Sequence, residues 1–471
     1  MKRKNLILVL SILASLTGCS YFEGFFSSFI NSGYGSLSQH HITSSSSSST
    51  TVIPYENESP LHEVLSKDED FQVALPTTGN VKVLVIPVEI GSATFSTEDL
   101  DKINLAFNGT SEETGYESVS SYYYKTSKGK LKIEAEISPV FQTGKSKGYY
   151  EVLYNNGKDV DCEILDNALP LLDELYDFSQ FDYNKDSYID GIYLIYSCDY
   201  SLSETSPFWA WCYEHTKNTN KYDNIEPRYF VWASKDFLYD PVNERKKINV
   251  NAETIIHETG HLFGLDDYYD YDTSAGPDGG LGGAAMMDSN VGDQDSFSKL
   301  LLGWSNPTYI YGEGTYTISP SESSNECLII PLRNNENEVF GEYLLIDYYT
   351  PTGLNEMQAG NFGLFSKNGV RIYHIDARID PNLGSPKNLN GYYSIFSFNN
   401  SDTQHKLIRM LEADNNKSIE RTGIASNYDL FTPGHSLSTI YNYDDVMYEN
   451  IITIVSMGDY ATIKITKKEE K

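Results

Sequence analysis

The feature that most constrains the fold is a short segment, residues 251–267, in which a helical pattern stops at a glycine. Asn251 is a residue type that caps helices, and residues 252–263 are compatible with the helix that would follow. Gly264 readily adopts a left-handed backbone, which is a common way for a helix to end. The sequence therefore predicts a helix followed at once by a bend that turns the chain back.

This helix and bend are predicted to form a metal site. His257 and His261 are four residues apart, so they lie on one helix face and can direct both imidazoles at one ion. The bend brings Asp267 within reach as a third ligand, with Asp266 as the alternative. Two imidazoles and one carboxylate leave a position for water, as in a catalytic zinc site. Glu258 follows His257 directly and is placed to accept a proton from that water.

A glycine-rich turn, residues 282–287, follows about twenty residues later. A turn of this kind after a zinc helix resembles the Met-turn of the metzincins, in which a methionine forms an apolar floor under the metal. We assign this position to Met287, with Met286 as the alternative. Residues 295–304 then predict a closing helix.

The chain resembles the immune inhibitor A-type secreted metallopeptidases of bacteria. The resemblance rests on His257–Tyr269, which follows the pattern His-Glu-x-x-His-x-x-Gly-Leu-x-Asp-x-Tyr, on Met287, and on the Ser-x-x-Lys-x-x-x-Gly-Trp segment at 296–304. Segments 118–129 and 369–376 also resemble family segments. One departure is Asp266, which stands where the family usually has proline.

The resemblance implies a zinc-dependent endopeptidase that acts on extracellular proteins. It carries His257, His261 and Asp267 over as the zinc ligands and Glu258 as the general base. Two other readings stay open, namely a surface-binding lipoprotein or adhesin with a non-catalytic metal site, and a metallohydrolase acting on glycan or peptidoglycan.

A second cation site is predicted between residues 182 and 191. Oxygen ligands recur there at alternating positions, as calcium requires; they are Asp182, Asn184, Asp186, the carbonyl of Tyr188, and Asp190. Ser187 replaces the glycine of an EF-hand loop and Tyr193 replaces its bidentate glutamate, so a shorter calcium loop is expected. The alternative is a turn rich in Asp and Asn that binds no ion.

The first residues predict a targeting signal and a membrane anchor. Residues 2–4 are basic, residues 6–16 form an apolar run too short to span a bilayer, and Cys19 follows a small residue. This resembles a bacterial lipobox, which implies a signal peptide at 1–19, lipidation of Cys19, and attachment to the outer face of the cell membrane. An ordinary signal peptide or an uncleaved anchor is the alternative.

The remaining chain predicts an α+β protein in several parts. Residues 20–60, which include an unbroken Ser/Thr run, are expected to be a flexible tether. A metzincin-like peptidase domain is expected at 61–305, with strands at 81–88, 131–137 and 192–196 and helices at 98–107 and 162–175. Short strand-like runs from residue 306 to 471 predict a β-sandwich; they are 316–319, 327–332, 342–348, 370–375, 392–398 and 451–455.

The net charge limits the kinds of partner that the chain can bind. With 35 Lys and Arg against 66 Asp and Glu, the net charge of −31 excludes a nucleic-acid-binding surface as the general design. His215 and His374 have no evident sequence partner and are expected to be structural. A disulfide between Cys198 and Cys212 is compatible with an extracellular protein, although sequence alone does not give connectivity.

Overall fold

The computed structural model describes residues 36–37, 59–66, 74–215, 220–239, 248–270, 280–333, 339–357, 364–378, 400 and 406–469. Contacts divide the chain into two compact units. The first, here the N-terminal unit, comprises Met1–Asn57, Gln72–Tyr124 and Gly129–Gly264; the second, the C-terminal unit, comprises Glu58–Phe71, Lys125–Lys128 and Leu265–Lys471. The predicted domain boundary at residues 305/306 falls inside the C-terminal unit and stays a prediction.

The N-terminal unit is built on a sheet with the order β1-β4-β2-β5-β7-β6, in which β3 also pairs with β2. Its strands are β1 (Ser36–Leu37), β2 (Gly79–Glu89), β3 (Leu131–Ile137), β4 (Phe141–Gln142), β5 (Ile192–Tyr196), β6 (Trp211–Glu214) and β7 (Tyr229–Ser234). The central strands β2, β5 and β7 are parallel, and β6 is antiparallel to β7 at one edge. The buried, β-branched run of β2 fits a central strand that is covered on both faces.

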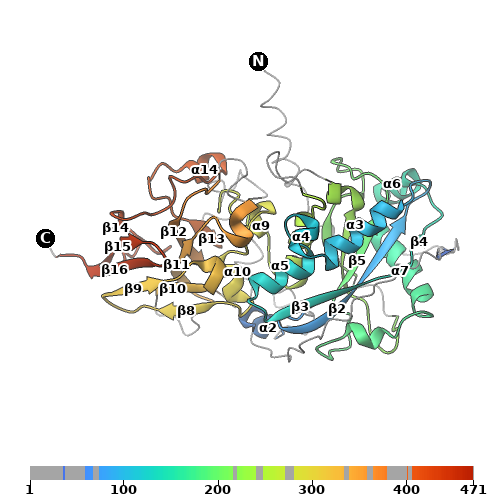
Figure 1. The fold of residues 1–471 in the computed structure, drawn as a ribbon, viewed down its shortest axis with the longest axis horizontal. Helices are drawn as coiled ribbons and strands as arrows, with labels where there is room; N and C mark the ends of the chain where they lie inside the picture. Colours follow the sequence, from blue (N-terminus) through green and yellow to red (C-terminus); the bar gives the residue numbers. More distant parts are fainter. Residues whose placement is uncertain are drawn as a thin grey trace, which may run out of the picture. The chain divides into compact units, whose positions relative to one another are not determined.

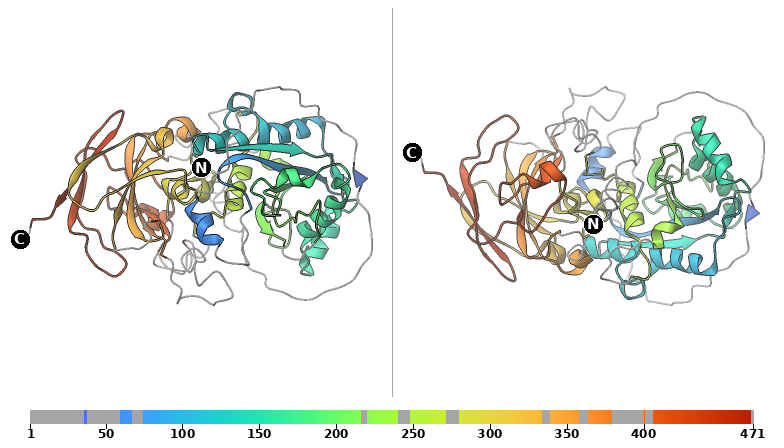
Figure 2. Two further views of the ribbon diagram at one scale, coloured as in Figure 1. Left: turned by 90° about the horizontal axis from the view of Figure 1, so that it is seen from below. Right: turned by 90° about the horizontal axis from the view of Figure 1, so that it is seen from above.

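Helices cover both faces of this sheet, as Figure 2 shows for α3 and α7. Alternate residues of each strand point to opposite faces, so Leu194 of β5 joins the core under α7, whereas Tyr193 packs its ring against Phe107 of α3. The helices that begin in this unit are α3 (Thr97–Asn108), α4 (Ser111–Thr114), α5 (Val119–Thr126), α6 (Lys147–Asn155), α7 (Val160–Leu172) and α8 (Glu253–Leu262). Two 3₁₀ helices are η1 (Phe178–Phe181) and η2 (Lys235–Tyr239).

The described residues of the C-terminal unit form two sheets (Figure 1). The five-stranded sheet has the order β13-β12-β11-β10-β8 and the four-stranded sheet the order β14-β15-β16-β9. Their strands are β8 (Asn306–Tyr309), β9 (Gly314–Ile318), β10 (Glu326–Pro331), β11 (Glu342–Tyr349), β12 (Gly369–Asp376), β13 (Ile408–Met410), β14 (Ser436–Leu437), β15 (Asn450–Met457) and β16 (Ala461–Lys467).

One apolar core contains side chains of both sheets, including Leu344 and Ile372 from the first and Ile452 and Ile463 from the second. Short helices complete this unit; they are α2 (Pro60–Leu65), α9 (Met286–Ser289), α10 (Ser296–Leu301), α11 (Ser321–Ser324), η3 (Gly353–Asn355) and α14 (Ser418–Thr422).

The mixed α+β class is therefore confirmed. Predicted strands 131–137 and 192–196 match β3 and β5, and the helix predicted at 98–107 matches α3 to within one residue at each end. The helix predicted at 162–175 begins two residues earlier and ends at Leu172. The strand predicted at 392–398 lies outside the described residues. The two-residue strand β1 falls within the segment predicted as a tether and pairs with β4.

Candidate metal centre

Helix α8 carries the predicted metal motif, and both of its ends are defined by local contacts. Ala252 is the cap residue, but the Asn251 side chain accepts a hydrogen bond from the Glu253 N–H at 2.9 Å, so Asn251 still satisfies one donor of the first turn. At the other end Gly264 has φ +87°, and its N–H donates to the His261 carbonyl at 2.9 Å. The left-handed glycine that the sequence predicts is confirmed.

The structure brings His257, His261 and Asp267 together. Each offers one ligand atom, and these atoms all lie within 4.8 Å of one another. The two imidazole rings are 5.0 Å apart between centroids and inclined by 83°, in a T-shaped arrangement. His257 and Asp267 are buried and His261 is half-buried. The bend after Gly264 therefore places Asp267 with the histidines, as predicted.

The position of Asp267 is fixed through the next residue, Tyr268. The Tyr268 N–H donates to the Met287 carbonyl at 2.8 Å, and the Asn400 side chain donates to the Tyr268 carbonyl at 2.7 Å. The Tyr268 ring is fully buried, and its hydroxyl hydrogen-bonds the Ser298 hydroxyl at 2.9 Å. Three hydrogen bonds to distant parts of the chain thus fix Tyr268, the residue that follows Asp267.

The glycine-rich turn meets this segment at Met287, whose side chain is fully buried, as is that of Met286. Asp288 follows and accepts a hydrogen bond from the Gly283 N–H. Burial, together with the negative charge of Asp267, raises the pKa of Asp288 to about 6. Sequence reasoning did not identify Asp288, whose carboxylate closes the turn.

Helix α8 is supported on its far side by two tyrosines. The Tyr123 hydroxyl donates to the Ile256 carbonyl at 2.6 Å, and the Tyr193 hydroxyl hydrogen-bonds the Thr259 hydroxyl at 3.0 Å. Thr259 in turn donates to the Ile255 carbonyl at 2.7 Å. These buried contacts fix the rotation of the helix and hence the direction of its histidines.

Two carboxyl groups of α8 are buried, Glu258 and Glu253. Glu258 directly follows His257 in the chain, and its role as the base stays a prediction. Glu253 lies one turn before His257, and burial raises its pKa to about 8. Its Oε1 makes no hydrogen bond among the described residues. The spacing of residues 253, 257 and 261 places Glu253 on the histidine face, a signal that sequence reasoning missed.

The predicted calcium residues form a tight turn in which carboxylates accept backbone hydrogen bonds. Asp182 accepts from the N–H groups of Asp186 and Ser187 at 3.0 and 3.2 Å, and Asp190 accepts from Tyr183 at 2.7 Å. Ser187 has φ +72° in the place of the EF-hand glycine.

Cation binding at this turn stays a prediction. Asp190 is 1% exposed, and its Oδ1 makes no hydrogen bond to any described residue. Burial and the neighbouring carboxylates of Asp186 and Asp182 raise its pKa well above the ordinary value, as expected for oxygens that a cation would stabilise. However, Asp182, Asp186 and Asp190 do not form a group of three converging ligand atoms comparable to the one at His257.

A third acidic group consists of Glu412, Asp414 and Asp429. Glu412 accepts hydrogen bonds from the N–H groups of Ser418 and Ile419, and Asp429 accepts from that of Ser426. Two of the three carboxylates thus hold the surrounding loop together.

Several smaller predictions are corrected or lie outside the described residues. His215 and His374 do have acidic partners, Asp166 at 3.0 Å and Glu342 at 2.9 Å, which folding brings from 49 and 32 residues away. No disulfide joins the cysteines of the described residues, so the suggested bond between Cys198 and Cys212 is wrong.

Cys19 and the predicted signal peptide lie outside the described residues. Within the described ranges, none of the helices has both the length and the apolar character needed to cross a bilayer. A comparison with known protein families and with curated proteins finds no match to this chain.

Proposed function

We propose that this chain is a zinc-dependent endopeptidase. The observation that supports the proposal is the convergence of ligand atoms of His257, His261 and Asp267 within 4.8 Å, together with the burial of Glu258, which directly follows His257. Two imidazoles and one carboxylate are a donor set that suits zinc and leaves a coordination position for water. The glycine-rich turn behind Asp267 would serve as the Met-turn, with Met287 as its methionine.

Each residue of the proposed site would have a separate role in catalysis. His257, His261 and Asp267 would hold the ion, which supplies the Lewis acidity that makes a water molecule nucleophilic near neutral pH. The Glu258 carboxylate accepts a proton from the attacking water and then delivers it to the nitrogen of the leaving amine. The contacts of Tyr123 and Tyr193 keep α8, and so the two histidines, in a fixed orientation.

A peptide substrate is favoured by the strand beside the helix. Within the N-terminal unit, β6 packs next to α8 and is an edge strand of the sheet in the described chain. An edge strand offers backbone groups to an extended peptide, which can add to the sheet as a further strand. A glycan has no backbone of this kind, so this arrangement favours peptide over glycan hydrolysis.

We propose a metzincin-like arrangement around α8 and a β-sandwich in the C-terminal unit, supported by the shared apolar core of its two sheets. A lipid anchor at Cys19 would hold the enzyme on the outer face of the cell membrane, where extracellular proteins are its substrates. Calcium at Asp182–Asp190 would stabilise the N-terminal unit.

The test compares wild type with Glu258→Gln, and with Glu112→Gln as an exposed control. We expect about one zinc per chain in all three proteins, and casein and gelatin cleavage lost only in Glu258→Gln. Equal cleavage by wild type and Glu258→Gln would refute the role of the base. Chains that bind zinc but cleave only mucin glycans or peptidoglycan would favour the glycan-hydrolase alternative.

A further inference from the structure

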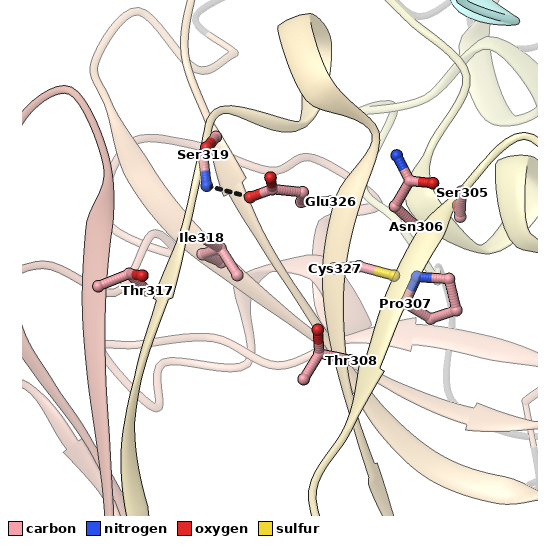
Figure 3. Close-up of a pocket in the computed structure, with 9 residues that line it drawn as sticks. All are labelled: Ser305, Asn306, Pro307, Thr308, Thr317, Ile318, Ser319, Glu326 and Cys327. Carbon is pink, nitrogen blue, oxygen red and sulfur yellow. Dashed lines mark hydrogen bonds between the residues drawn. The ribbon is translucent and has the colours of Figure 1, made fainter.

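The C-terminal unit contains a pocket where two consecutive strands separate. In the described chain, β8 is the last strand of one sheet and β9 of the other; β10 pairs with β8 and contacts β9. The pocket has a volume of about 580 Å³ and is lined by residues of these strands and of the turns next to them. Figure 3 shows Glu326 of β10 extending toward Ser319, with Asn306, Pro307 and Thr308 on the opposite wall.

The lining is polar but almost uncharged. Most of its polar groups are hydroxyls, joined by one carboxamide and one carboxylate; they belong to Ser305, Thr308, Thr317, Ser319, Asn306 and Glu326. None of the lining residues is Lys, Arg or His. The pocket therefore offers nothing to neutralise a phosphate, a sulfate or a carboxylate, and an anionic ligand is disfavoured.

Hydrogen-bonding capacity remains for a ligand. Glu326 accepts a single hydrogen bond in the pocket, from the Ser319 N–H at 2.8 Å, whereas a carboxylate can accept about four. The hydroxyls of Thr308 and Ser319 make no hydrogen bond to any described residue. Each hydroxyl can both donate and accept, and the carboxylate can accept from two neighbouring hydroxyls of one ligand.

The same strand ends are poorly suited to an added peptide strand. Pro307 has no N–H, and Glu326 already occupies the N–H of Ser319. Removal or capping of edge donors is a way in which proteins prevent strand addition. The ligand should therefore bind through hydroxyl groups rather than through a peptide backbone.

We propose that this pocket is a binding site for a neutral saccharide of one or two rings. Such a ligand carries adjacent hydroxyls that match the carboxylate and hydroxyls of the lining, and it carries no charge that Glu326 would repel. A site of this kind would attach the C-terminal unit to neutral glycans. The proposal does not depend on the metal centre.

The experiment uses the full chain with Glu258→Gln, so that binding is measured without hydrolysis. The probes are an immobilised set of neutral mono- and disaccharides in gluco, galacto, manno and N-acetyl forms, together with their sialylated counterparts. Glu326→Gln preserves an acceptor for the Ser319 N–H, and Thr308→Val preserves side-chain shape. Glu449→Gln, an exposed position outside the pocket, is the matched control.

We expect at least one neutral saccharide to bind, with affinity falling about tenfold in Glu326→Gln and in Thr308→Val and unchanged in Glu449→Gln. Thermal unfolding of each variant checks that the fold is retained. The proposal is overturned if no neutral saccharide binds, if the pocket variants bind as well as the control, or if sialylated probes bind equally well. None of these results depends on zinc content or on casein cleavage, so failure here is separate from failure of the proposed function.

Discussion

Replacement of Gly264 tests whether the bend after α8 determines the metal centre. Gly264 has φ +87°, a conformation that costs a residue with a Cβ roughly 1–2 kcal/mol. Asparagine tolerates this conformation better than alanine does, because its short polar side chain bonds locally. We therefore expect Gly264→Ala to lower the free energy of unfolding by about 1–2 kcal/mol, and Gly264→Asn to lower it by about half as much.

The assay is urea unfolding of the metal-free chain, followed by competitive zinc titration. If the chain relieves the strain by moving the bend, Asp267 moves away from His257 and His261, and zinc affinity should fall about tenfold in Gly264→Ala. The expected order of both stability and affinity is Gly, then Asn, then Ala. Wild-type stability and zinc affinity in Gly264→Ala, or a larger loss in Gly264→Asn than in Gly264→Ala, would contradict this prediction.

Two further predictions concern buried carboxylates. Calcium should raise the melting temperature of wild type and leave that of Asp190→Asn unchanged, because Asp190 Oδ1 is buried without a hydrogen bond among the described residues; an equal rise in both would count against this site. Although burial opposes ionisation of Glu342, hydrogen bonds from His374 and Arg333 lower its pKa from 4.5 to about 2. A lowered pKa stabilises the fold above pH 4.5, and this contribution, ~3 kcal/mol, should vanish as the pH falls toward 2. Urea unfolding across this range should show a smaller loss in Glu342→Gln, and an unchanged loss would contradict the assignment.

Local patterns in the sequence predict the elements better than they predict the assembly. The β-branched run at residues 81–88 and the alternation at 131–137 correspond to β2 and β3, because the spacing of apolar residues directly reflects which faces are buried. The order of the strands does not follow from such patterns. Pairing of β2 with β5 joins Leu84 to Ile192, more than a hundred residues apart, and nothing in either strand specifies the other.

The same distinction applies to the candidate sites. The residue types at 257, 258, 261 and 267 predict a metal centre, and the structure brings the three expected ligands together. His374 had no predicted partner, because Glu342 reaches it only through the antiparallel pairing of β11 with β12. Glu253 was missed for another reason. The spacing of residues 253, 257 and 261 places it on the histidine face, but the sequence does not show that its side chain is buried.

A peptide spanning residues 250–270 measures how much of the metal centre depends on the rest of the chain. It contains every proposed ligand, but a helix as short as α8 is marginally stable alone. It also lacks Met287 and Asn400, whose contacts fix both backbone groups of Tyr268 beside Asp267. We expect the peptide to bind zinc at least about a hundredfold more weakly than the full chain, because it must order both the helix and the bend on binding. Equal affinity in competitive titration would show that the motif alone builds the site, and that the contacts from distant residues serve only the fold.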